Sequence, residues 1–237
     1  MGKRRGPRDI YAEITEVFPS IQGEGIFVGQ PQVFIRFAKC NLSCDYCDTT
    51  KDGGKPYGVY DLLNCVNKIN GLDRIDTVSI TGGEPLLYSD FLKQFLPQLK
   101  KRNFKVYLET NGTLPAELKK VLGLVDTIAM DIKMPSSQRG RNLWKSHKDF
   151  LRAANKKNVF VKAVVTDRTS AEEIKKTAAI IKAISTRIPF VIQPVTPVNR
   201  TTKKIPPGRL LEFQALAKSV LNDVRIVPQI HKALGVR

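Results

Sequence analysis

Three cysteines lie close together in the sequence, at a spacing that suits one inorganic cluster. Cys40, Cys44 and Cys47 fall within the stretch CysAsnLeuSerCysAspTyrCys, so a single short loop can supply three thiolate ligands. A closed structural zinc site needs four ligands, and the two histidines, His147 and His231, lie far along the chain from this loop. The arrangement predicts an iron–sulfur cluster that keeps one iron open for a small molecule.

A sheet is expected to position these cysteines, because short β-rich runs alternate with helical patterns along the chain. The clearest helical pattern begins at Ser170, which can form a capping box with Glu173. Repeated alternation predicts an α/β fold with a parallel sheet and outer helices, either open and doubly wound or an incomplete (β/α) barrel of about six parallel strands. The expected strands are residues 33–37, 77–80, 105–108, 127–130, 159–165 and 190–192.

Polar or glycine-rich clusters directly follow five of these expected strands. In both architectures ligands bind at the carboxyl ends of the strands, which meet at one edge of the sheet. We therefore expect the five clusters to converge on one mouth. They are Cys40 and residues 81–85, 109–112, 131–133 and 193–195.

Length and composition are those of a single domain covering residues 1–237. The chain is 42% hydrophobic, enough to bury a substantial core. No apolar run approaches the ~20 residues of a membrane helix, and the basic first residues lead into no signal-like apolar stretch. The sequence predicts a cytoplasmic protein, in which clustered cysteines bind metal rather than form disulfides. Cys65 lies on the apolar face of an expected helix and is predicted to be a small buried side chain.

The chain is strongly basic, with 39 Lys and Arg against 22 Asp and Glu and a net charge of +17. Such a balance occurs in proteins that bind nucleic acid, anionic surfaces or phosphate-bearing ligands. Here the basic residues are spread over all the expected helices, and no aromatic residues interleave with them as they do in a strand-binding groove. A solvated surface is favoured over a nucleic-acid site.

The cysteine spacing, together with ThrGlyGlyGluPro at residues 81–85, resembles the radical S-adenosylmethionine (SAM) superfamily. The resemblance implies a [4Fe-4S] cluster on Cys40, Cys44 and Cys47 whose open iron is chelated by SAM. An electron from the cluster then cleaves the SAM and yields a 5'-deoxyadenosyl radical. The glycines would let the backbone approach SAM closely, and the acidic residue would receive its amino group.

Longer stretches resemble the 7-carboxy-7-deazaguanine synthase family. They are ValPheProSerIleGlnGlyGluGly from residue 17, PheIleArgPheAlaLysCys from residue 34, GlnProValThrPro from residue 193 and the final ProGlnIleHisLys segment from residue 228. This resemblance implies an incomplete (β/α) barrel, a homodimer and a magnesium-dependent conversion of 6-carboxy-5,6,7,8-tetrahydropterin to 7-carboxy-7-deazaguanine with loss of ammonia. It also implies a substrate-binding turn at about residues 17–30, a C-terminal tail that closes the site, and an electron donor such as flavodoxin or ferredoxin.

The pterin substrate needs partners for a guanine-like edge and for one carboxylate. Glu24 suits the amino and ring hydrogens of the edge, and Arg36 suits the carboxylate by bidentate pairing, although a structural ion pair is the alternative for Arg36. The resemblance adds His231 at the pterin site. The expected substrate-binding residues are Ile21, Gln22, Gly23, Glu24, Arg36, Thr81 and His231.

The strand ends are expected to bind SAM, and the residues after the third cysteine to bind magnesium. The family pattern places Mg²⁺ on Thr49, with Asp48 as a weaker second ligand. Some relatives carry a serine-proline-lysine triplet where this chain has Asp131, Ile132 and Lys133, so only Lys133 matches that pattern. Glu109 precedes an AsnGly pair, which is also a common turn, so a turn is the alternative role for this segment. The expected SAM contacts are Gly82, Gly83, Glu84, Glu109, Asp131, Lys133, Gln193, Pro194, Val195 and Thr196.

Two alternatives stay open at this point. A glycyl-radical-enzyme activase shares the short length and the cysteine loop but needs a broad groove for a partner protein. A basic RNA-binding protein with a redox-sensing iron–sulfur cluster belongs to another class and is supported mainly by the charge of +17. The amide- and acid-containing turn at Gln22 to Glu24, with Arg36 and His231, favours a small polar pocket instead.

Overall fold

A computed structural model describes residues 10–47, 53–73, 75–197 and 203–236. Within these ranges the strands form one curved sheet, in the order β3-β1-β2-β4-β5-β6-β7-β8-β9. The strands are β1 (Ala12–Ile21), β2 (Pro31–Phe37), β3 (Lys55–Tyr57), β4 (Thr77–Gly82), β5 (Lys105–Thr110), β6 (Thr127–Asp131), β7 (Asn158–Val165), β8 (Phe190–Pro194) and β9 (Val224–Ile226).

All six strands expected from the sequence are present as β2 and β4 to β8, and they pair in parallel. The structure adds β9 to the parallel set, and β1 and β3 as antiparallel strands at the other edge. β3 and β9 end the strand order without pairing with each other, so the sheet is an incomplete barrel, as expected.

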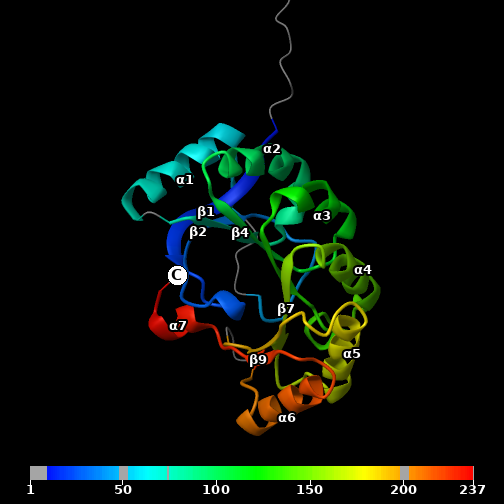
Figure 1. Ribbon diagram of the computed structural model, residues 1–237. Helices are drawn as coiled ribbons and strands as arrows, with labels where there is room; N and C mark the ends of the chain where they lie inside the picture. Colours follow the sequence, from blue (N-terminus) through cyan, green and yellow to red (C-terminus); the bar gives the residue numbers. More distant parts are fainter. Residues whose placement is uncertain (1–9, 48–52, 74, 198–202, 237) are drawn as a thin grey trace, which may run out of the picture.

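Helices cover the outer face of the sheet. Figure 1 shows α1 to α6 following one another around the outside, while α7 lies at the open side of the curve. The helices are α1 (Val59–Asp73), α2 (Ser89–Lys100), α3 (Pro115–Val121), α4 (Trp144–Ala154), α5 (Ala171–Lys182), α6 (Pro207–Lys218) and α7 (Ile230–Leu234), with short 3-10 turns at η1 (Gly25–Phe27), η2 (Pro85–Tyr88), η3 (Leu122–Leu124) and η4 (Pro135–Ser137). None of the helices in the described ranges is long and apolar enough to cross a bilayer.

The expected capping box of α5 is present. Ser170 Oγ accepts from the Glu173 backbone N–H at 3.2 Å, and the Ser170 N–H donates to the Glu173 carboxylate at 2.9 Å. Because both groups satisfy donors that the first turn leaves unpaired, they define where α5 begins. Ile174, Ala178 and Ile181 then face the sheet and are fully buried.

The alternation of side chains along each strand separates two environments. On β4, Val78 and Ile80 point outward into one continuous apolar core beneath the helices. A much smaller apolar cluster lies on the inner face, where Phe27 of η1 packs on Tyr107 and Phe160. Since η1 fills only part of the inner face, polar side chains line the rest.

Candidate active site

A cavity of about 430 Å³ opens at the carboxyl ends of the parallel strands. The five expected clusters converge there, each contributing at least one lining residue. Most of the expected site residues line this one cavity: Ile21, Gln22, Gly23, Glu24, Arg36, Cys40, Cys44, Cys47, Thr81, Gly82, Gly83, Glu109, Asp131, Lys133, Gln193, Val195, Thr196 and His231.

Glu84 and Pro194 are not among the residues of the cavity wall. Asp48 and Thr49 lie outside the described residues. Glu84 lies behind the wall, fully buried, where its carboxylate accepts from the Asn111 N–H at 2.8 Å and the Thr110 hydroxyl at 3.0 Å. Burial raises the pKa of Glu84 to about 7, although these donors oppose the shift. This side chain fixes the loop after β4 against β5.

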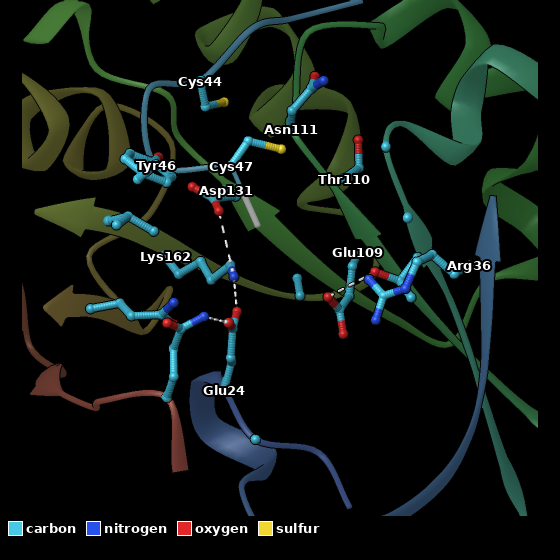
Figure 2. A pocket seen from close by; sticks show the side chains of 18 of the residues that line it. Glu24, Arg36, Cys44, Tyr46, Cys47, Glu109, Thr110, Asn111, Asp131 and Lys162 are labelled. Atoms are coloured by element: carbon cyan, nitrogen blue, oxygen red, sulfur yellow. Dashed lines mark hydrogen bonds and ion pairs between the residues drawn. The ribbon is translucent and has the colours of Figure 1, made fainter. Parts of the chain in front are cut away.

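The three thiols lie at one end of the cavity, where Figure 2 shows Cys44 and Cys47. Gln138 Nε2 donates to Cys44 Sγ at 2.8 Å, and the Leu42 N–H lies 3.4 Å from Cys40 Sγ. N–H groups facing sulfur stabilise thiolates and tune the cluster that they bind. No three His, Cys, Asp or Glu side chains of the described ranges form a site for a single metal ion. The donor set, three thiols with polar N–H groups behind them, fits an iron–sulfur cluster.

The two glycines at the end of β4 are required by the protein itself. A Cβ on Gly82, which has φ +127°, would lie 2.2 Å from the Phe37 carbonyl oxygen. A Cβ on Gly83 would lie 1.8 Å from the Lys39 carbonyl oxygen. The Gly83 N–H donates to Phe37 O at 3.0 Å, so the end of β4 packs directly on the chain entering the cysteine loop. The glycines therefore position the cysteine loop and also line the cavity.

A chain of buried charges crosses the cavity floor, and Lys162 of β7 lies at its centre. Lys162 pairs with Glu24 and lies 3.4 Å from Asp131 (Figure 2). Asp131 in turn pairs with Lys133 at 2.8 Å. Burial alone would disfavour a charged Glu24. The charge and hydrogen bond of Lys162 and the amide of Gln229 nevertheless lower the pKa of Glu24 to about 2. Glu24 is thus held as an ionised acceptor in the cavity.

Glu109 organises the neighbouring part of the wall. Its carboxylate accepts from Gln22 Nε2 at 2.9 Å and from the Thr81 hydroxyl at 3.1 Å. Gln22 also accepts the Glu24 N–H at 3.0 Å through its side-chain oxygen. Glu109 therefore lies in the mouth rather than serving only in a turn, and it joins the N-terminal turn to the ends of β4 and β5.

Arg36 combines the two roles considered for it. Its Nε donates to Glu16 at 2.8 Å, so the structural ion pair exists, yet the side chain also lines the cavity. The guanidinium carbon lies over the Phe18 ring, 5.7 Å from its centre, which helps to hold the side chain in place. Because the ion pair uses Nε, the terminal nitrogens can still donate to a carboxylate.

The C-terminal segment folds back over the N-terminal turn. The Ile230 N–H donates to Gly23 O at 2.9 Å, and Gln229 Nε2 donates to Glu24 at 2.7 Å. His231 packs so closely on Gly23 that a Cβ there would lie 2.0 Å from His231 Nδ1. Gly23 is needed because this contact leaves no room for any side chain.

The structure brings in residues that the sequence reasoning missed. Tyr46, between the second and third cysteines, has Lys133 Nζ 5.1 Å from its ring centre. Lys162 could have been suspected, because it is the only charged residue in the apolar run ValPheValLysAlaValVal. Asn111 and Gln229 lie in segments that were expected at the site, but their individual roles were not predicted, and Gln138 carries no sequence signal, because the partners of all three lie far away in the sequence.

The structural role expected for His147 agrees with its position, whereas Cys65, expected to be buried, is only half-buried. His147 is fully buried in α4, with Nε2 3.1 Å from Asn111 O. Cys65 is half-buried on α1, on the same face as the fully buried Leu62 and Val66.

Comparison with known proteins agrees with this geometry. The family model described as the radical SAM superfamily matches residues 34–187. The 7-carboxy-7-deazaguanine synthase of Geobacter sulfurreducens is 43% identical over 94% of this chain and 97% of the relative. The synthase of the same name from Methanothermobacter thermautotrophicus is 36% identical over 95% of this chain and 98% of the relative.

The fold has a solved counterpart as well. The crystal structure of QueE from Escherichia coli superposes with a TM-score of 0.65 at 21% identity, covering 93% of this chain and 95% of that one. At this identity the superposition shows that the incomplete barrel is shared. The family match and the identities over nearly the full length of the relatives show the family of this chain. It belongs to the radical SAM superfamily and, within it, to the 7-carboxy-7-deazaguanine synthase family.

Proposed function

We propose that this chain converts 6-carboxy-5,6,7,8-tetrahydropterin to 7-carboxy-7-deazaguanine with loss of ammonia, as a radical SAM lyase of 7-deazapurine biosynthesis. The observation that carries the proposal is a single cavity that has three thiols at one end and a set of charged and amide side chains at the other. A volume of about 430 Å³ is in the range of small-molecule sites. It suits a pterin beside SAM rather than the partner protein of an activase.

Membership of the superfamily implies a [4Fe-4S] cluster and SAM. Cys40, Cys44 and Cys47 would hold the cluster, which when bound supplies the electron that cleaves SAM to a 5'-deoxyadenosyl radical. The backbone at Gly82 and Gly83 and the wall formed by Asp131, Lys133, Gln193, Val195 and Thr196 would bind SAM, together with Tyr46. Glu84 would not touch SAM itself but would hold the loop after β4, and with it the backbone of Gly82 and Gly83, in position.

The substrate end would recognise the pterin by its hydrogen-bonding edge and its carboxylate. Glu24, kept ionised by Lys162, accepts from the amino and ring N–H groups. Gln22 and the backbone of Gly23 complete the edge, and Thr81 lies beside Gln22, since both side chains donate to Glu109. Arg36 pairs with the carboxylate through its terminal nitrogens, and His231 covers the bound ring. The C-terminal tail, held on the N-terminal turn by the Ile230 and Gln229 hydrogen bonds, would exclude water from the bound substrate.

Magnesium is the third expected cofactor, with Thr49 as ligand and Asp48 as a weaker one. Hard oxygen ligands suit Mg²⁺, which takes few protein ligands and completes its shell with water and substrate oxygens. Removing Mg²⁺ with a chelator should raise the KM for the pterin, and Thr49→Ala should reproduce this loss while Thr50→Ala does not. Equal effects of the two substitutions would remove Thr49 from the assignment.

The partners that the resemblance implies are part of the proposal. They are a homodimer and an electron donor such as flavodoxin or ferredoxin, acting in the cytoplasm, where free thiols persist. Sedimentation of the reconstituted protein tests the dimer.

The deciding experiment is anaerobic reconstitution with iron and sulfide, followed by incubation with SAM, dithionite, Mg²⁺ and 6-carboxy-tetrahydropterin. Mass spectrometry should show 7-carboxy-7-deazaguanine. Cys44→Ala should abolish the product and Cys65→Ala should leave it unchanged, because Cys65 lies outside the cavity wall. Formation of 5'-deoxyadenosine without the deazapurine would contradict the proposed substrate and favour an activase.

A further inference from the structure

A second hollow lies on the outside of the barrel, between α4 and α5. It has a volume of about 380 Å³, and its apolar lining consists of Trp144 from α4 and Ala179, Ile180 and Ala183 from α5 and its C-terminal end. Lysines form its rim: Lys145 and Lys148 from α4 and Lys176 from α5. Figure 1 shows the two helices beside each other on the outer face. We call this hollow the α4–α5 groove.

The groove has a positively charged rim, and the acidic residues Asp149 and Glu172 on the two helices pair with Arg152 and Lys175 instead. All three rim lysines are exposed, and none of them forms an ion pair with another residue of the described ranges. No acidic residue is among the residues that line the groove. An apolar floor within a cationic rim complements a protein surface that presents carboxylates around an apolar centre. The net charge of +17 adds long-range attraction for such a partner.

The groove is also connected to the cysteine loop through packed side chains. The Trp144 and His147 rings meet edge to face, with centres 6.4 Å apart. His147 Nε2 lies 3.1 Å from the Asn111 carbonyl oxygen, and Asn111 Nδ2 lies 3.9 Å from Cys40 Sγ. Each neighbouring pair along this path is in van der Waals or hydrogen-bond contact. The side chains therefore connect Trp144 in the groove to Cys40 without a gap.

We propose that the α4–α5 groove is the docking site for an acidic one-electron carrier protein, which delivers its electron to the cluster through Trp144, His147 and Asn111. The inference rests on the proposed function, because it requires the cluster on the three cysteines. One electron leaves the reduced carrier and enters the oxidised cluster, and no bond forms or breaks. Charge attraction would bring the carrier to the rim, and the apolar floor would hold it over Trp144.

The test uses the reconstituted holoenzyme and a photochemically reduced acidic flavodoxin as the probe. The variant combines Lys145→Glu, Lys148→Glu and Lys176→Glu. The matched control changes the net charge equally at exposed positions away from the groove, with Lys68→Glu on α1, Lys93→Glu on α2 and Lys101→Glu directly after α2. Binding is measured by calorimetry at low and high salt, and reduction of the cluster by electron paramagnetic resonance.

We expect the groove variant to bind flavodoxin ~tenfold or more weakly at low salt, since reversed rim charges repel an acidic partner. Cluster reduction by flavodoxin should slow by a similar factor, while reduction by dithionite should keep its wild-type rate. The control should lose much less affinity. Equal losses in the two triple variants would overturn the groove as the docking site and leave only general charge attraction.

An uncharged substitution provides an independent check. Trp144→Ala removes the aromatic floor without altering charge, and should weaken flavodoxin binding at high salt as well, by about fivefold or more, because a central aromatic residue of an interface costs over ~1 kcal/mol when truncated. Unchanged binding would contradict the proposal. Deazapurine formation by the wild type with dithionite reports the proposed function separately, so failure of either idea is recognisable.

Discussion

The two faces of the sheet place neighbouring residues of one strand in different environments, an apolar core outside and a polar cavity inside. On β4, the outward Ile80 is fully buried in the apolar core, while its neighbour Thr81 points into the cavity and donates to Glu109. On β7, the outward Val161 packs beneath the helices, and the inward Lys162 joins two carboxylates. The outer face therefore contributes mainly to stability, and the inner face presents charged side chains that can bind a ligand.

The largest expected effect is on the inner face, at Lys162. Lys162→Met would leave Glu24 and Asp131 without their shared cation in a buried site, which costs about 3–5 kcal/mol when a buried pair is broken. Substrate turnover should also be lost, because Glu24 would be protonated more easily. Chemical denaturation gives the free energy of unfolding, with exposed Lys156→Met as a control expected within about 0.5 kcal/mol of wild type. Equal midpoints would show that the charge chain is not structural.

The next effect concerns two buried groups behind the cavity wall that respond to pH with opposite signs. Burial disfavours the imidazolium and lowers the pKa of His147 from 6.5 to about 4, so the unfolded chain binds the proton first. The free energy of unfolding therefore falls as pH drops from 6.5 to about 4, by about 3 kcal/mol in total, since one pKa unit corresponds to ~1.36 kcal/mol. His147→Gln should remove this part of the acid sensitivity.

Glu84 provides the opposite case. Burial raises its pKa from 4.5 to about 7, so its contribution is complete below pH 4.5 and is lost as pH rises towards 7. Unfolding of the apoprotein should be measured between pH 4 and 7. Relative to the wild type, His147→Gln should lose less stability as pH falls, and Glu84→Gln should lose less as pH rises. Parallel curves would mean that neither group titrates differently in the folded chain.

A smaller effect separates the neighbours on β4. Ile80→Val removes one methylene from the outer core, and should cost about 0.5–1.5 kcal/mol while leaving kcat/KM unchanged. Thr81→Val keeps the shape but removes a donor to Glu109, so kcat/KM should fall. Steady-state kinetics of the reconstituted enzymes make the comparison. Matching kinetic losses would show that the two faces are not functionally distinct.

The smallest stability change should come from Gly208, and Gly23 provides a contrasting glycine whose substitution should affect substrate binding. A Cβ added to Gly208 of α6 would have nothing within 4 Å, and Gly208→Ala should stabilise by about 0.5–1 kcal/mol with normal activity. Gly23→Ala would push His231 away and should raise the KM for the pterin. A normal KM for Gly23→Ala would separate the tail from substrate binding.

Local sequence patterns were sufficient to predict the elements that depend on neighbouring residues, namely the central strands and the start of α5. Apolar β-rich runs predicted all six central strands, and Ser170 with Glu173 predicted the start of α5, because each signal lies within a few residues. β3 and β9 were missed, since three residues are too few to show a period. β1 was missed because polar residues interrupt its apolar pattern.

The sequence by itself determined the cysteine loop, the strands that end at the cavity and, through resemblance, the family. Only the tertiary structure decided that Lys162 meets Glu24, 138 positions away, and that Gln229 reaches the same carboxylate across 205 positions. It also assigned Gly83 to packing on the cysteine loop and placed Glu84 behind the wall. The physical reason is that burial and pairing depend on which strands become neighbours, and no local pattern of residue types contains that information.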